Sequence, residues 1–309
     1  MRVRLIELRS MLKSYGRVAS LLLMMVLGTL LPQLNVMSFL VQYFLMLMLF
    51  FAFLDIEIHP RSIPVSVLWV LLANIVIAFL AYGLLSLFDP LLALAGFVTA
   101  IAPTAIAAPV IIGFIDGQVD YVVGSVLLTN VAMALVVPVV LPFLVGKVVQ
   151  VTTWQVLQPV LVTMFVPLVL ARLAGRLPGK VRVFVGKGKA YAYPLWLANL
   201  IILSAKAADF VRTEWSSAAM QVMWIALISM VICAVNFSVG ALIGGRRHWQ
   251  ESSQSLGQKN NSFVIWIALT FIHPIVALGP TFYVLFHNLY NSWQIYRFEK
   301  RGRSGKTGS

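Results

Sequence analysis

The sequence contains few charged residues. Only 11% of its 309 residues are charged, whereas 61% are hydrophobic. A soluble globular protein has about 25% charged and about 45 to 50% apolar residues, so the composition excludes an ordinary water-soluble domain. The 23 Lys and Arg outnumber the 10 Asp and Glu, but they occupy short loops between apolar runs and form no face interleaved with stacking aromatics. We therefore expect the lipid bilayer as a partner and no nucleic acid.

Cysteine is almost absent as well. Cys233 is the single cysteine, which excludes an intrachain disulfide and a cysteine metal cluster. The four His and ten acidic residues show no metal-ligand spacing, and no set of Ser, His and Asp stands out as a catalytic triad. We expect no cofactor, no metal and no enzyme activity.

Long apolar runs make up most of the sequence. A helix needs roughly 20 mainly apolar residues to cross a bilayer, and we predict an all-α polytopic membrane protein with ten spans. They lie at residues 18–36, 37–54, 62–87, 90–115, 119–145, 153–173, 190–210, 215–243, 252–272 and 274–296. With a cytoplasmic N-terminus, nineteen Lys and Arg fall on the cytoplasmic side and two on the other. This asymmetry predicts two cytoplasmic termini, in a bacterial inner (plasma) membrane.

The predicted spans form two halves of five, residues 1–148 and 149–309. Because five is odd, the second half inserts upside down, as in the inverted repeats of many secondary transporters. In each half the fourth span is interrupted, by Pro103 and Pro109 in the first and by a polar block at residues 255–262 in the second. Proline lacks the amide donor and clashes with the preceding turn. Irregular backbone at membrane depth is tolerated only inside protein or beside water, so two facing breaks predict a polar site near the midplane.

Lys259 is the most unusual residue of the polar block. A Lys at mid-membrane costs roughly 2.5 to 3.5 kcal/mol on insertion scales, so it needs a partner or a task. We interpret it as buried; the alternative is that it snorkels at the cytoplasmic surface. The predicted substrate-binding residues are Lys259, Asn260, Asn261, Ser262, Gln258, Thr104, Asn130 and His287, and the predicted broken-helix backbone is at Pro103, Pro109 and Gly257. For the uncharged members the alternative role is structural, as partners of unwound backbone or of neighbouring helices.

The ten spans and these blocks resemble the bile acid:sodium symporter family. The resemblance is carried by the Ala-Pro break of the fourth span, which continues to Gly117 and Pro138, and by the block Gly257-Gln258-Lys259-Asn260-Asn261 ahead of His287-Asn288. It implies a ten-helix fold in which spans 3, 4, 5, 8, 9 and 10 form a core domain beside a panel domain. Spans 4 and 9 would cross at their breaks, and organic anions would move between the two domains by alternating access.

The chain departs from this family at the sodium ligands. The family's polar and acidic ligands lie in spans 4, 5 and 9. The aligned positions hold Ala108, Pro109, Val122, Val126, Ser255 and Lys259. Sodium requires oxygen ligands, which alanine, proline and valine side chains do not offer, and an ammonium group repels the ion.

We therefore expect a sodium-independent secondary transporter of a small organic anion, in which Lys259 stands in for the bound cation. Lys259 could hold the anion directly, helped by the N-termini of half-helices. It could instead release a proton in each cycle, because loss of water disfavours the ammonium form. The alternatives are a sodium- or proton-coupled symporter with a rearranged ion site, and a membrane receptor or scaffold that has lost transport.

Overall fold

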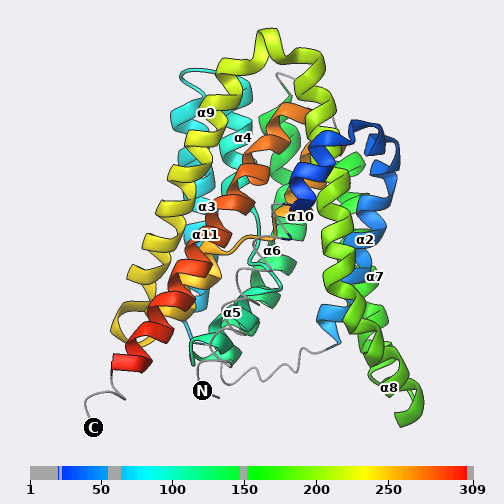
Figure 1. Cartoon of the computed structure of the whole chain (residues 1–309), viewed down its shortest axis with the longest axis vertical. Coiled ribbons are helices and arrows are strands. Elements are labelled where there is room, and N and C mark those ends of the chain that lie inside the picture. Colours follow the sequence, from blue (N-terminus) through cyan, green and yellow to red (C-terminus); the bar gives the residue numbers. More distant parts are fainter. Residues whose placement is uncertain (1–19, 21–22, 55–63, 147–151, 305–309) are drawn as a thin grey trace.

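The structure, a computed structural model, describes residue 20 and residues 23–54, 64–146 and 152–304. Within these ranges the chain folds into helices and forms no strand, which confirms the all-α prediction (Figure 1). The elements in order are η1 (Pro32–Phe39), α2 (Leu40–Phe53), α3 (Ser66–Leu85), α4 (Pro90–Ile101), α5 (Ala108–Phe114), α6 (Val119–Val145), α7 (Thr153–Ala174), α8 (Gly179–Lys187), η3 (Gly188–Tyr191), α9 (Ala192–Gly257), α10 (Asn261–Phe271) and α11 (Pro274–Ser304).

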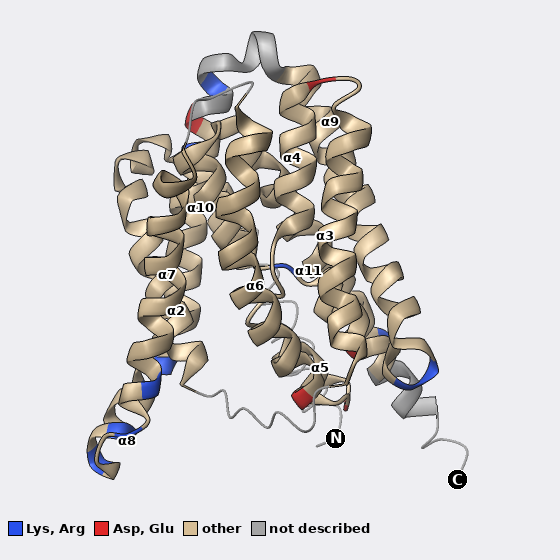
Figure 2. Ribbon diagram, turned by 180° about the vertical axis from the view of Figure 1, so that it is seen from behind, with Lys and Arg blue, Asp and Glu red and all other residues tan. Residues whose placement is uncertain are grey.

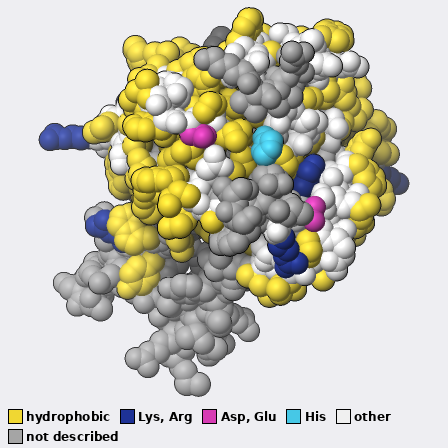
Figure 3. Space-filling view, turned by 90° about the horizontal axis from the view of Figure 1, so that it is seen from above, with side chains coloured by type: hydrophobic (Ala, Val, Ile, Leu, Met, Phe, Trp, Pro, Cys, Tyr) yellow, Lys and Arg dark blue, Asp and Glu magenta, His cyan; other side chains and the backbone are white. Residues whose placement is uncertain are grey.

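The long apolar helices identify a membrane protein. Among the described residues, five helical stretches are long and apolar enough to cross a bilayer: Pro32–Phe53, Ser66–Leu85, Val119–Val145, Thr153–Ala174 and Ala219–Gly257. Hydrophobic side chains dominate the rim in the view along the long axis of the bundle (Figure 3). Five is fewer than the ten predicted spans, partly because a broken span falls into pieces that are each too short to cross alone. The apolar helices α4 and α10 are two such pieces.

α9 contains two of the predicted spans. The sequence predicted separate spans at residues 190–210 and 215–243; residues 192–257 are assigned to one helical run, but its earlier and later parts lie on different sides of the bundle (Figure 1). Backbone angles depart from helical values at Gly245 and His248, where the chain reverses (Figure 1). Gly245 has φ +56°, a left-handed conformation that glycine adopts without steric cost. The first predicted span also differs, because residues 32–39 form a 3-10 helix and residues 18, 19, 21 and 22 lie outside the described ones.

The interruption of the fourth predicted span begins where a proline requires it. Asp89 caps the start of α4 by accepting the amide of Leu92 at 2.8 Å. The helix ends at Ile101, and Ala102 is extended at φ −50° and ψ 135° because a following proline disfavours the helical conformation. Pro109 behaves differently from the prediction. It lies in the first turn of α5, where a missing amide hydrogen costs no hydrogen bond, so it starts a helix and does not break one.

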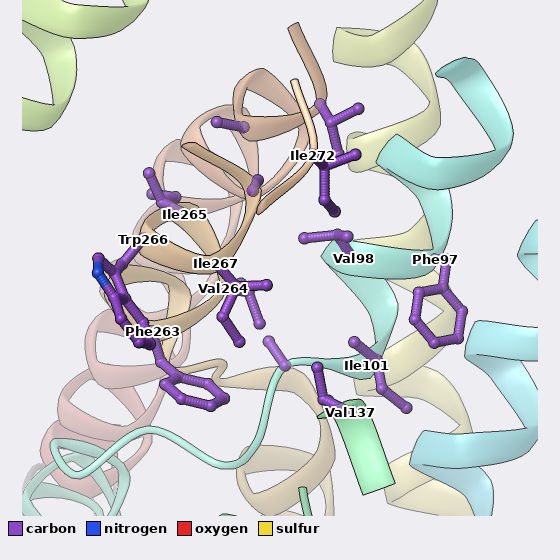
Figure 4. Close-up of a cluster of buried hydrophobic side chains, with 14 of the residues drawn as sticks. Phe97, Val98, Ile101, Val137, Phe263, Val264, Ile265, Trp266, Ile267 and Ile272 are labelled. Atoms are coloured by element: carbon purple, nitrogen blue, oxygen red, sulfur yellow. The ribbon is translucent and has the colours of Figure 1, made fainter. Parts of the chain in front are cut away.

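Apolar packing holds the two interrupted regions together. Val98 of α4 faces the buried side of α10, which includes Val264 and Ile267 (Figure 4), whereas Phe97 packs edge to face with Phe79 and Tyr82 of α3. On the other side of the bundle α2 packs against α7 (Figure 1). Most of the coloured Lys and Arg lie at the end of the bundle that holds α8, the reversal of α9 and the last turns of α11, which we call the basic end (Figure 2).

Candidate functional site

The two interruptions meet in the interior of the protein. Residues 102–107 connect α4 to α5, and residues 258–260 connect α9 to α10. The amide of Ala105 donates to the carbonyl of Gln258 at 2.8 Å, and the amide of Asn260 donates to the carbonyl of Pro103 at 2.8 Å. These bonds form an isolated antiparallel bridge between Thr104 and Lys259. The extended segments thus satisfy each other's backbone, which an apolar interior requires. We call this contact the crossing.

Side chains from α6 and α9 fix the position of Thr104 in the crossing. Its amide donates to Thr129 Oγ1 at 3.0 Å, and its hydroxyl donates to the carbonyl of Ser255 at 2.6 Å. Its carbonyl accepts from Asn130 Nδ2 at 2.9 Å. The structure therefore brings the predicted residues Thr104 and Asn130 together with the polar block. In the structure both residues form hydrogen bonds with backbone groups, which is the structural role that was the alternative to substrate binding.

Lys259 is buried, with 2% of its surface exposed. The position at the protein surface, which was the alternative interpretation, is therefore wrong for this structure. Nζ donates to the carbonyl of Ala100 at 3.0 Å and to Oδ1 of Asn74. Ala100 lies in the last turn of α4, whose C-terminal end carries the negative pole of the helix dipole and favours a cation. No carboxylate among the described residues pairs with Lys259, so carbonyl and amide oxygens surround its charge.

Asn74 is a candidate site residue that sequence reasoning missed. It lies in the middle of α3, is 2% exposed, and its Nδ2 donates to the carbonyl of Ile101 at 3.0 Å. Asn74 thus bridges the ammonium of Lys259 and the C-terminal end of α4. A signal was present in the sequence, because Asn74 interrupts the apolar run 67–81 and polar side chains in such runs usually find a partner on another helix.

Several polar atoms around the crossing remain without a protein partner. Among the described residues no hydrogen-bond partner is found for the buried atoms Ser125 Oγ, Asn130 Oδ1, Ser255 Oγ, Gln258 Oε1, Asn260 Nδ2 and Asn261 Oδ1. Buried polar atoms are normally paired, so each unpaired one needs an explanation, such as strain, a water, an ion or a ligand. Gln258, Asn260 and Asn261 were predicted site residues, and the structure places them together here.

The remaining predicted residues lie at the edge of this group. His287 of α11 contacts Asn261, with 3.4 Å between Nδ1 of the ring and the amide nitrogen. Ser262 is half-buried on α10. Gly257 ends α9, and its carbonyl accepts from the hydroxyl of Tyr283 at 2.7 Å. An added Cβ at Gly257 would lie 2.3 Å from the ring of Phe237, so close packing requires glycine there.

The comparisons with known proteins do not identify the chain. No protein-family model matches it, and no curated protein matches it significantly. The resemblance to the bile acid:sodium symporter family therefore stays a prediction from the sequence.

Proposed function

We propose that the chain is a secondary transporter that moves a small organic anion across the membrane by alternating access, without sodium. Lys259 then provides a permanent cation where the resembled family binds a metal ion. The observation that carries this proposal is the position of the Lys259 ammonium, buried at the crossing and held by Asn74 and the last turn of α4. Oxygen atoms of an amide and a carbonyl are the ligands that a small cation would use.

The role of Lys259 follows from its contacts. Two of its three N–H donors bind protein oxygens, so its main task in the proposal is to neutralise the crossing. The anion would contact the unpaired polar atoms of Gln258, Asn260 and Asn261. The positive charge nearby favours an anion without forming a tight ion pair, which a carrier must be able to break.

The proposed architecture has ten helices in two inverted repeats, residues 1–148 and 149–309, with core and panel domains. It is supported by the similar interruptions between α4 and α5 and between α9 and α10, and by their contact. We further propose that the basic end faces the cytoplasm of a bacterial cell, because Lys and Arg gather there (Figure 2).

A second candidate is a symporter that binds a sodium ion or a proton in a rearranged site. The unpaired side-chain oxygens of Ser125, Asn130, Ser255 and Asn261 favour it, because hard cations bind oxygen. Their environment argues against a bound metal ion, since the Lys259 ammonium adjoins the same crossing.

Uptake into vesicles that contain the purified protein tests the proposal. The probes are small carboxylates and sulfonates, beginning with radiolabelled taurocholate, in sodium and in choline buffer. We expect equal uptake in both buffers, loss of uptake in Lys259→Gln, and retained uptake in Lys206→Gln, a control that changes a half-buried Lys of α9. Strict sodium dependence, or full uptake by Lys259→Gln, would contradict the proposal. Binding without uptake of any probe would favour the receptor or scaffold.

A further inference from the structure

Buried polar side chains continue from the crossing toward the basic end. On α9 they are Glu251, Gln254 and Ser255, followed by Gln258 directly after the helix, and on α11 they are His287, Asn291 and Gln294. Each of the seven is at most 6% exposed, although the two helices lie within an otherwise apolar bundle. We call this set the polar seam.

The spacing places each row on one face of its helix. Residues 251, 254, 255 and 258 follow the three- and four-residue intervals of a helix face, as do 287, 291 and 294. The two helices pack against each other, and the rows make contact. Gln254 Nε2 donates to Asn291 Oδ1 at 2.9 Å and to Gln294 Oε1 at 2.5 Å. Asn261, just beyond the crossing, contacts His287.

The seam leaves polar atoms unpaired in its middle. Gln254 Oε1, Asn291 Nδ2 and Gln294 Nε2 find no hydrogen-bond partner among the residues that the structure describes. Two are donors and one is an acceptor. Water can both donate and accept, and buried water typically makes about three hydrogen bonds to such groups. A hydrophobic occupant would leave all three atoms unsatisfied.

One end of the seam lies at a surface turn and the other at Lys259. Glu251 Oε1 accepts the amide of Gln118 at 2.8 Å, in the turn between α5 and α6 at the basic end (Figure 2). From Glu251 to Gln258 the helix rises about 10 Å, and Gln258 precedes Lys259. The seam thus connects the basic end to the crossing along the contact between α9 and α11.

We propose that the polar seam is a water-filled route that gives the Lys259 site access to solvent at the basic end. This inference rests on the proposed function, because a carrier must expose its site to water. The route runs between two helices of the proposed core domain, and not between core and panel.

Cysteine labelling tests the route without any substrate. Cys233→Ser removes the single cysteine, and 2-aminoethyl methanethiosulfonate, added to the protein in vesicles, reacts with thiolates that form in water. Ser255→Cys introduces a nearly isosteric probe into the seam. Ser229→Cys is the matched control, because Ser229 is equally buried on α9 but its hydroxyl bonds the carbonyls of Ile225 and Gly279.

We expect Ser255→Cys to react on the order of tenfold or more faster than Ser229→Cys, since a dry thiol does not ionise readily. On α11, Asn291→Cys is expected to react and Leu289→Cys, on the outer surface of the helix, is not. Equal rates within both pairs, or no reaction at the seam positions, would overturn the route.

The same experiment separates this inference from the proposed function. An unreactive seam in a protein whose sodium-independent uptake requires Lys259 would overturn the route and leave the carrier proposal standing. A reactive seam in a protein with strictly sodium-dependent uptake would support the route and contradict the role assigned to Lys259.

Discussion

The contact between Asn74 and Lys259 predicts a measurable coupling between α3 and the polar block. Asn74→Leu removes an acceptor of the ammonium and the bond from Nδ2 to Ile101. Lys259→Met removes the charge and keeps much of the side-chain volume. A hydrogen bond to a charged group contributes about 1.5 to 3 kcal/mol, and the contact is buried, so solvent does not screen it. The bond to Ile101 is lost with Asn74 in either background, so it cancels in a double-mutant cycle.

We therefore expect Asn74→Leu and Lys259→Met to be coupled by about 1.5 to 3 kcal/mol in the free energy of unfolding. The double variant should be less destabilised than the sum of the two single changes. In Asn74→Leu the buried ammonium keeps only the carbonyl of Ala100, whereas the double variant buries no charge at this position. Equilibrium unfolding in mixed micelles with increasing dodecyl sulfate measures all four proteins.

A matched cycle uses Asn74→Leu with Lys206→Met, which changes a Lys of α9 that is not a partner of Asn74 in the hydrogen bonds described above. Distant changes add within about 0.3 to 0.5 kcal/mol, so this control should show no coupling. If the effects of Asn74→Leu and Lys259→Met on the free energy of unfolding also add within about 0.3 to 0.5 kcal/mol, the contact is refuted. The arrangement of the ammonium and its oxygen partners that depends on this contact is then refuted as well.

Three further changes test the crossing and the reversal of α9, each by the free energy of unfolding in the same micelles. Thr104→Val loses the hydroxyl bond to Ser255 and should cost about 1 to 3 kcal/mol, whereas Thr104→Ser should retain most of the stability; equal losses would contradict a role for the hydroxyl. Gly257→Ala should destabilise because its Cβ would meet an aromatic ring at 2.3 Å, whereas Gly83→Ala, with nothing within 4 Å, should stabilise α3 by about 0.5 to 1 kcal/mol. Gly245→Ala should cost about 1 to 3 kcal/mol because φ 56° with ψ −145° is a conformation that essentially only glycine adopts; an unchanged Gly245→Ala would argue against the reversal.

Local chemistry in the sequence predicted a large part of the architecture and of the site. The low charge and long apolar runs predicted an all-α membrane protein, and Pro103 and the block at residues 255–262 predicted where regular helix would be interrupted. These inferences succeed because they depend on single residues and their immediate neighbours: proline lacks a donor, and polar side chains are costly in lipid. The same reasoning placed a gap between residues 243 and 252, where Gly245 and His248 leave the helix, but it did not predict that residues 211–214 would be helical, since an apolar composition does not say whether helix continues between two spans.

Tertiary structure alone decided which groups meet. Asn74 and Lys259 are 185 positions apart, and neither residue's local sequence specifies the other as partner. Likewise, the rows on α9 and α11 are visible as helical spacing, but their contact depends on how two helices pack. The sequence determined that charge and amides would be buried in an apolar protein, because burial follows from hydrophobicity summed along the chain. The fold decided which oxygens surround that charge and which polar atoms stay unpaired, because hydrogen bonds depend on distances that exist only after distant segments have packed together.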